Sequence, residues 1–227
     1  MIKFNGTNSY GVIPSALLGG KSNFTIEMKV STTEERTRGA AWDSREFIGL
    51  EVPNNCNEFG FGVNGGYLSL FTGNNDSYYQ SSYKINDNQK KNIVLTNTNG
   101  QLKLYLVDKN EDGTNTANLA TQGYLGTSGS YDYYLGYNND GWYCQFNLYY
   151  LAIYNTSLDT SRFFTYTETP ISKYENTYKD GKLIDYNGNY NLPLYNIEYK
   201  NETHIFYSNL KIESDDNDTK RTTRRGD

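Results

Sequence analysis

Residues 92–108 read NIVLTNTNGQLKLYLVD. Two runs rich in Val, Ile, Leu and Tyr, residues 92–96 and 102–107, lie on either side of Thr98-Asn99-Gly100. Asn and Gly tolerate the positive φ angles that a tight hairpin needs, and the flanking runs have the composition of strands. The stretch therefore predicts a β-hairpin. The same pattern of short strand-like runs separated by Gly, Asn and Asp recurs along the chain.

The run at residues 23–30 alternates between apolar and polar side chains, which is typical of a half-buried strand. The apolar positions, which we expect on one buried face, are Phe24, Ile26, Met28 and Val30. The polar positions, which we expect in solvent, are Thr25, Glu27 and Lys29. Further strands are predicted at residues 47–52, 58–63, 67–71, 133–137 and 145–154, and the NGG triplet at 64–66 predicts a second hairpin. Long helical periodicity is absent, so the chain is predicted to be all-β.

The chain divides into three parts by pattern. Residues 1–165 carry the regular strands and are long enough to form one sandwich domain, which ends in a short helical turn within 157–164. Residues 166–212 hold a few possible strands and are interpreted as an irregular or β extension packed on the main domain or on a neighbour. Residues 213–227 form a charged C-terminal tail without apolar residues, which we expect to be disordered alone.

Composition excludes several classes of function. A formal net charge of −5 disfavours nucleic acid as a partner, because phosphate binding depends on clustered Lys and Arg. No apolar run is long enough to cross a membrane, and the N-terminus lacks the pattern of a signal peptide. The two cysteines, Cys56 and Cys144, are expected to be free thiols, and disulfide pairing stays an alternative. The 23 tyrosines favour sheets and binding surfaces.

Several segments, in chain order, resemble the laminin-G-like and concanavalin A-like lectin/glucanase superfamily over residues 1–165. The resemblance is carried by the opening FNGTNSY at 4–10 with Ile13-Pro14, the strand at 23–30, the central stretch 83–108, YLGY at 134–137, and the closing strand at 148–155 with Leu158. It implies an antiparallel two-sheet jelly-roll sandwich, followed here by an irregular C-terminal extension.

Many members of this superfamily bind calcium or glycan through acidic residues near the rim of the sandwich. In this sequence Asn5 stands where Asp is common, and Tyr149 and Tyr150 replace the acidic pair of the closing strand. A second possible calcium loop, at 108–113, has Leu119 where the bidentate Glu would stand, so a plain hairpin turn is favoured. We therefore assign no metal and no cofactor, with calcium as an open alternative.

Catalysis has little support in the sequence. The single histidine, His204, lies in the extension without a Ser or Cys motif nearby. No strand offers the Glu-x-Asp-x-x-Glu arrangement that would present paired carboxylates for glycoside hydrolysis. The remaining strand carboxylates are assigned to solvated faces: Glu27, Glu46, Glu51 and Glu58. We predict that the protein is not an enzyme and assign no catalytic residue.

Loops rich in Tyr, Trp, Asn and Asp carry the candidate binding site. Aromatic faces stack on the apolar side of a pyranose ring, and amides and carboxylates bind its hydroxyls. The candidate ligand-binding residues are Trp42, Asn74, Asp76, Tyr78, Tyr79, Asn138, Asp140, Trp142 and Tyr143. The alternative is that these are ordinary loops of an Asn- and Tyr-rich protein, with Trp42 and Trp142 in the core.

These observations favour a non-catalytic module that recognises carbohydrates or other host-surface polymers. We predict a virion or extracellular location, as a phage capsid decoration, fibre or tail adhesin. The alternative is a structural decoration or assembly protein that binds neighbouring virion or surface subunits through its C-terminal extension and tail. An enzyme on the same fold is the third possibility.

Overall fold

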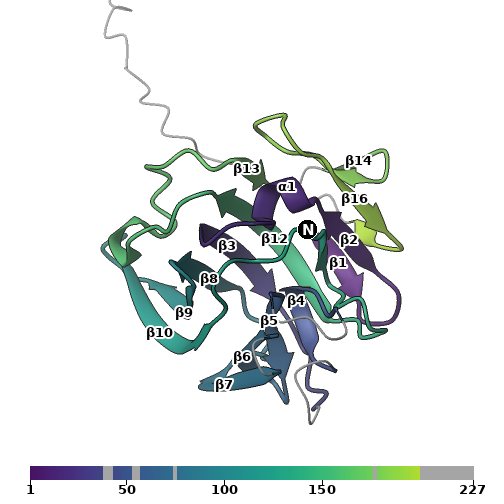
Figure 1. Cartoon of the computed structure of the whole chain (residues 1–227), viewed down its shortest axis with the longest axis horizontal. Helices are drawn as coiled ribbons and strands as arrows, with labels where there is room; N and C mark the ends of the chain where they lie inside the picture. Colours follow the sequence, from purple (N-terminus) through teal and green to yellow (C-terminus); the bar gives the residue numbers. More distant parts are fainter. Residues whose placement is uncertain (38–42, 53–56, 74–75, 176–177, 200–227) are drawn as a thin grey trace, which may run out of the picture.

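The computed structural model of the 227-residue chain describes residues 1–37, 43–52, 57–73, 76–175 and 178–199. Two antiparallel sheets form a sandwich, and a short helix, α1 (Ser15–Leu18), follows the second strand (Figure 1). The predicted all-β, two-sheet jelly-roll fold is therefore confirmed. The cysteine Cys56, the histidine His204 and the tail 213–227 lie outside the described residues.

In the described part of the chain, sheet A has the strand order β10-β9-β8-β3-β12-β1-β17, with β13 beside β12. Its strands are β1 (Ile2–Asn5), β3 (Asn23–Ser31), β8 (Lys91–Thr98), β9 (Gln101–Lys109), β10 (Asn115–Tyr124), β12 (Gln145–Tyr154), β13 (Ser172–Tyr174) and β17 (Glu198–Tyr199). This order places the first strand, β1, beside the closing strand β12, with Phe4 opposite Phe146.

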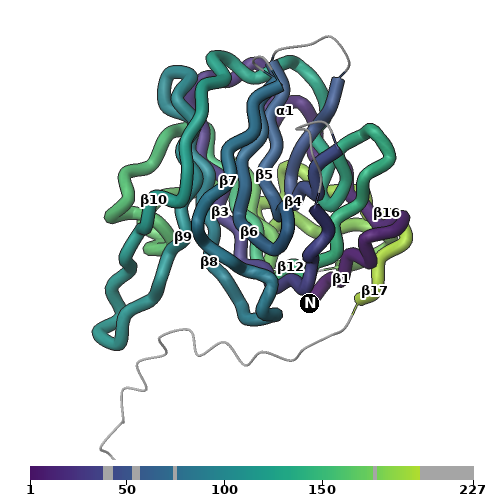
Figure 2. The backbone as a smooth tube through the Cα atoms, turned by 90° about the horizontal axis from the view of Figure 1, so that it is seen from below, coloured from purple at the N-terminus to yellow at the C-terminus, as the bar shows by residue number. Residues whose placement is uncertain are grey.

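Sheet B has the order β14-β15-β16-β2-β11-β4-β5-β6-β7 among the described residues. Its strands are β2 (Tyr10–Ile13), β4 (Arg45–Gly49), β5 (Phe59–Asn64), β6 (Tyr67–Thr72), β7 (Ser77–Lys84), β11 (Tyr133–Leu135), β14 (Tyr178–Lys179), β15 (Lys182–Leu183) and β16 (Leu192–Tyr195). Figure 2 shows β4, β5, β6 and β7 side by side in this sheet.

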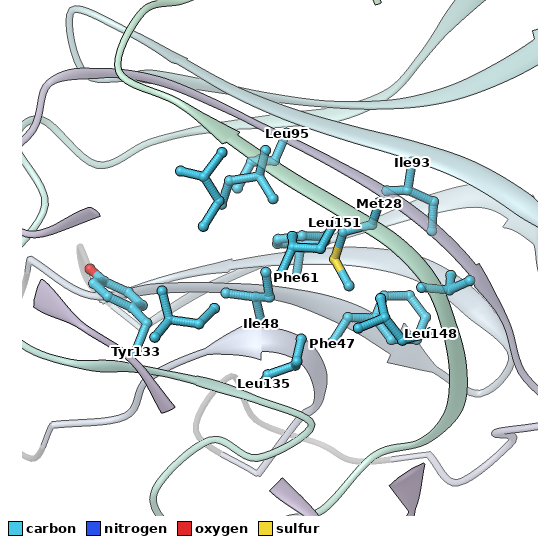
Figure 3. Packing of buried hydrophobic residues seen from close by; sticks show 14 of the residues in the cluster. Met28, Phe47, Ile48, Phe61, Ile93, Leu95, Tyr133, Leu135, Leu148 and Leu151 are labelled. Atoms are coloured by element: carbon cyan, nitrogen blue, oxygen red, sulfur yellow. The ribbon is translucent and has the colours of Figure 1, made fainter. Parts of the chain in front are cut away.

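The core lies between the two sheets and follows the alternation of the strands. The side chains predicted to be buried in β3 are fully buried: Phe24, Ile26, Met28 and Val30. Sheet B contributes rings such as Phe47, Phe61 and Tyr133 to the same core cluster. Phe47 and Phe61 lie close to side chains of sheet A in Figure 3. Alternation therefore predicted the inner face of the sandwich correctly.

The predicted hairpins are confirmed by their backbone angles. Asn99 and Gly100, with φ of 50° and 91°, join β8 to β9. Gly65 and Gly66, with φ of 59° and 86°, join β5 to β6. The 108–113 segment forms part of the β9–β10 hairpin connection, in which a carboxylate oxygen of Asp112 accepts hydrogen bonds from the backbone and hydroxyl of Thr114.

The prediction that Thr25 and Glu27 face solvent is wrong, because both are fully buried. The chain after β12 folds back over the outward face of sheet A, through the 3-10 turn η1 (Thr160–Arg162), and Leu158 and Phe163 pack there in a second apolar cluster. The carboxylate of Glu27 accepts hydrogen bonds from the hydroxyls of Tyr150 and Tyr154, at 3.4 and 3.1 Å, and from the N–H of Phe164, at 2.7 Å.

The described part of the extension adds strands to both sheets. β13 pairs with β12, and β17 pairs with β1 in sheet A. β14, β15 and β16 join sheet B at β2, so the N-terminal strands and the last described strands lie side by side (Figure 1). The carboxylate of Asp185 holds this region together by accepting hydrogen bonds from four backbone N–H groups, those of Lys173, Asn187, Asn189 and Tyr190.

Candidate functional site

The structure places the predicted binding residues in different roles. Trp42 and Asn74 lie outside the described residues. Asn138 is fully buried, and its amide oxygen accepts hydrogen bonds from the N–H groups of Asp140 and Trp142, at 2.9 and 3.2 Å. Asn138 therefore holds the loop in shape and is not exposed to a ligand.

Two of the predicted aromatic residues are packing residues. Trp142 is half-buried, and the guanidinium of Arg45 lies 4.8 Å from the centre of its ring. Tyr79 packs against the main core, and its ring fills the space above Gly123 of β10. Tyr79 therefore packs on the sandwich, and Trp142 packs on Arg45 without being part of either core cluster of the described residues.

The two predicted loops meet at Glu51. Asp76 and Asp140 both lie near enough to Glu51 to raise its pKa by charge repulsion. The N–H of Glu51 also donates a 2.7 Å hydrogen bond to the carbonyl of Asn138. The loop after β6 and the loop after β11 are therefore brought to one end of sheet B.

Five tyrosines form a contiguous aromatic surface on the outward side of sheet B, which we call the tyrosine platform. Its members are Tyr10 (β2), Tyr134 (β11), Tyr137 and Tyr143 (the two sides of the loop after β11), and Tyr195 (β16). Ring centres lie 4.6 Å apart for Tyr10 and Tyr195, 4.5 Å for Tyr137 and Tyr143, and 5.4 Å for Tyr134 and Tyr137. Tyr195 is 44% exposed and the other four rings are partly exposed.

Sequence reasoning identified only Tyr143 of this platform. The tyrosines of β2 and β11 that were missed follow the same alternation as the core residues, but they stand at the outward positions of their strands. In YGVI at 10–13 and YYL at 133–135, Ile13, Tyr133 and Leu135 point into the core, which leaves Tyr10 and Tyr134 on the outward face. The signal was present, but the pairing of β2 with both β11 and β16 cannot be read from any one strand.

Next to the platform lies a small cavity in sheet B, which we call the acidic pocket. It has a volume of about 10 Å³, room for about one water-sized group. Its acidic residues are Glu46, Glu51, Glu58 and Asp76, and its other lining residues include Leu50, Phe59, Phe71 and Thr72. The assignment of Glu46 and Glu58 to solvated faces is wrong, because they are 3% and 2% exposed.

Glycines make room for these carboxyl groups. A Cβ atom at Gly49 or at Gly60 would overlap the carboxyl group of Glu46. A Cβ atom at Gly73 would overlap the carboxyl group of Glu58 in the same way. Glu46 and Glu58 therefore occupy space that any other residue at these three positions would fill.

Burial and mutual repulsion shift the acidity of the pocket. Burial raises the pKa of Glu46 well above its usual value, and the charges of Glu51 and Glu58 raise it further, against a hydrogen bond from Ser44. Burial and the charges of Glu58, Asp76 and Asp140 raise the pKa of Glu51 to about 7. Burial also raises the pKa of Glu58. The pocket is therefore a site where negative charge is poorly compensated.

The pocket and the platform adjoin in one row across sheet B. Tyr134 of β11 is the cross-strand partner of Gly49, Gly60 is the partner of Phe71, and Phe71 is the partner of Tyr78, on which it stacks at 5.2 Å. Directly opposed residues place their side chains on the same face, with Cβ positions about 5 Å apart. The two glycines therefore form a gap between Tyr134 and the Phe71–Tyr78 pair, with the Glu46 carboxyl group in it.

No helix in the described ranges is long and apolar enough to span a membrane. Among the same residues, no group of three acidic, histidine or cysteine side chains is arranged to hold a metal ion. Cys144 is a free, buried thiol, and burial raises its pKa well above the usual value.

Comparison with known proteins agrees with this architecture. The chain resembles the LG1–3 region of the laminin α2 chain, with 14% identity and a TM-score of 0.50 over 70% of this chain and 31% of that one. It also resembles the heptameric SAP-like pentraxin of Limulus polyphemus, with 14% identity and a TM-score of 0.49 over 71% and 78% of the two chains. A third similar structure is the CBM40 of Ruminococcus gnavus IT-sialidase bound to α2,3 sialyllactose, with 12% identity and a TM-score of 0.48 over 74% and 98%.

At 14% identity the likeness to the laminin fragment shows the fold alone, and the chain spans only about a third of that fragment. None of the curated protein sequences compared with the chain matches it. The family described as the concanavalin A-like lectin/glucanases superfamily matches residues 5–162, which is more than half of the 227 residues. With its two antiparallel sheets and this match, the chain belongs to the concanavalin A-like lectin/glucanases superfamily.

Proposed function

We propose that the protein is a non-catalytic carbohydrate-binding module and that the tyrosine platform is its binding surface. The observation that carries this proposal is the contiguous set of five tyrosine rings on the outward side of sheet B. Most buried aromatic rings stabilise a core, but these rings stack on one another at the surface. A surface of this kind offers ring faces, ring edges and phenol hydroxyls to one ligand.

The chemistry of the platform suits a sugar. The C–H face of a pyranose packs on an aromatic ring, and its hydroxyls exchange hydrogen bonds with phenols and amides. Stacking of Tyr10 on Tyr195 and of Tyr137 on Tyr143 restrains the rings before a ligand arrives. Restrained rings lose little conformational entropy on binding, which favours affinity.

The proposal is tested with a glycan array and titration calorimetry on the purified chain, together with Tyr10→Ala and Tyr195→Ala variants. We expect specific glycan binding that weakens by about tenfold or more in each variant, since each removes one stacking ring. Tyr186→Ala is the matched control, because Tyr186 is 78% exposed and lies outside the platform. Binding that survives both platform substitutions, or no binding to any glycan, would contradict the proposal.

The placement on a virion or other extracellular surface remains a prediction, as does assembly with neighbouring subunits. On such a surface, repeated display would strengthen weak sugar contacts by multivalency. The strands of the extension up to Tyr199 pair within the chain itself, so the assembly prediction rests on residues 200–227. A chain ended after residue 199 should then lose any self-association or subunit binding that the full chain has, while it keeps glycan binding.

A further inference from the structure

The acidic pocket contains buried oxygen atoms without hydrogen-bond partners. Both carboxyl oxygens of Glu58, Oε2 of Glu46 and the hydroxyl of Thr72 are buried and have no partner of normal geometry among the described residues. Glu58 is only 2% exposed, and it lines the cavity. The backbone N–H groups of Glu58 and Asn57 lower its pKa, but neither makes a hydrogen bond of normal geometry to it.

Such groups are costly for the fold. An unpaired buried carboxylate loses its hydration without a replacement, and an unsatisfied buried acceptor costs about 1–3 kcal/mol or more when charged. The chain nevertheless keeps Gly49, Gly60 and Gly73 where larger residues would displace these carboxyl groups. An arrangement of unpaired acceptors around a water-sized cavity is suited to a small cationic donor.

A primary ammonium group fits this cavity better than a metal ion. Calcium needs about six to eight oxygen ligands at about 2.3–2.6 Å, and the described residues contain no group of three acidic, histidine or cysteine side chains that could hold a metal ion. An ammonium group needs only three acceptors at about 2.7–2.9 Å, and it is similar in size to water. The unpartnered oxygens of Glu46, Glu58 and Thr72 supply such acceptors.

We infer that the acidic pocket receives the ammonium group of an amino sugar whose ring lies beside Tyr134, so that the ligands are glycans with free amino groups. This inference rests on the proposed carbohydrate-binding function. Tyr134 and Gly49 are cross-strand partners, and the carboxyl group of Glu46 occupies the space above Gly49. A sugar ring against Tyr134 can therefore direct an amine substituent into the pocket.

The test compares oligomers of glucosamine with oligomers of N-acetylglucosamine of equal length in titration calorimetry. Only the first carries ammonium groups, so we expect the wild-type chain to bind it at least about tenfold more tightly. Glu58→Gln keeps the shape of the side chain and should reduce this preference by about tenfold, and Glu46→Gln is the second variant. Glu111→Gln, at an exposed hairpin residue, makes the same change of charge and should leave the preference unchanged.

Each other outcome overturns the inference in a distinguishable way. Equal affinity for both oligomers, with binding still lost in Tyr10→Ala, would remove the amino-sugar assignment and keep the proposed function. Failure of both oligomers to bind overturns the inference, and the glycan array then decides the proposed function separately.

Tighter binding of penta-lysine with the same dependence on Glu58 would assign a peptide amine instead. Calcium binding that is lost in Glu58→Gln and that displaces the glucosamine oligomer would assign a metal site. Thermal denaturation of each variant checks that it is folded.

Discussion

Among single residues, the unusual feature of sheet B is that buried carboxyl groups occupy the space left by glycines that have no Cβ atom. Glu46 and Glu58 are almost fully buried, and each lies over a glycine on a neighbouring strand or turn. A residue with Cβ at Gly60 would force the Glu46 carboxyl group to move. The position of each carboxyl group therefore depends on residues that are distant in the sequence.

This dependence predicts a coupling between Gly60 and Glu46. Gly60→Ala should lower the free energy of unfolding by about 1–3 kcal/mol, as overpacking of a filled site does. In a Glu46→Ala background the same change should cost less by at least about 1 kcal/mol, because the overlapping carboxyl group is gone. Urea denaturation of the wild type, the two single variants and the double variant measures the coupling. Gly60→Ala that lowers the free energy of unfolding equally in both backgrounds would refute it.

A second prediction concerns pH. The folded-state pKa of Glu51 is raised from 4.5 to about 7, so its favourable contribution to stability is complete below about 4.5 and is lost as the pH rises through about 7. Glu51→Gln should therefore raise the free energy of unfolding at about pH 8 by about 1–2 kcal/mol, discounted for the partial exposure of the side chain, and by little at about pH 5. Urea denaturation at both pH values, with Glu111→Gln as control, measures this. A variant with the same pH dependence as the wild type would contradict the prediction.

At the scale of elements, alternation predicted inner faces well and outer faces poorly. The apolar positions of β3 are buried as expected, and the two predicted hairpins have the expected positive φ angles. Glu27 is buried too, because the segment after β12 folds over the outward face of sheet A. A strand pattern describes the chemistry of each face, but a covering segment from elsewhere decides whether a polar face meets water.

The same distinction applies to the candidate site. Loop composition led to Asp76 and Asp140, which meet near Glu51, and to Tyr143, which belongs to the tyrosine platform. It also led to Asn138 and Trp142, which hold the loop and pack on Arg45. Residue type identified polar and aromatic loops, but their exposure depends on neighbours that the loop sequence does not contain.

At the scale of the whole molecule, both ends of the described chain are built into the sandwich. β17 pairs with β1, and β16 pairs with β2, so Tyr195 stacks on Tyr10 across 185 positions of sequence. One ring of the tyrosine platform therefore comes from the extension. The extension completes the candidate binding surface as well as the two sheets.

This arrangement predicts that residues 1–165 alone are unstable. A chain of residues 1–165 lacks four extension side chains that are buried in the core of the full chain. These are Tyr174, Leu183, Leu192 and Leu194. At about 1.5–3 kcal/mol for each buried side chain, the loss of about 6–12 kcal/mol is comparable with the whole stability of a domain, about 5–15 kcal/mol. Circular dichroism on heating should show no cooperative transition for 1–165. A transition like that of the full chain would establish 1–165 as an independent folding unit.

Local pattern was enough to predict most strands of the sandwich, two of its hairpins and the inner face of β3, because these depend on side-chain alternation and on turn residues within a few positions of each other. It did not predict β7 or β10. The grouping of Glu46, Glu51, Glu58 and Asp76 in one pocket, and of tyrosines from β2, β11 and β16 in one platform, arises only in the folded sandwich. Those groupings follow from the order and register of strands that are far apart in the chain. Strand order and register are set by the packing of the whole sandwich, and no local pattern encodes them.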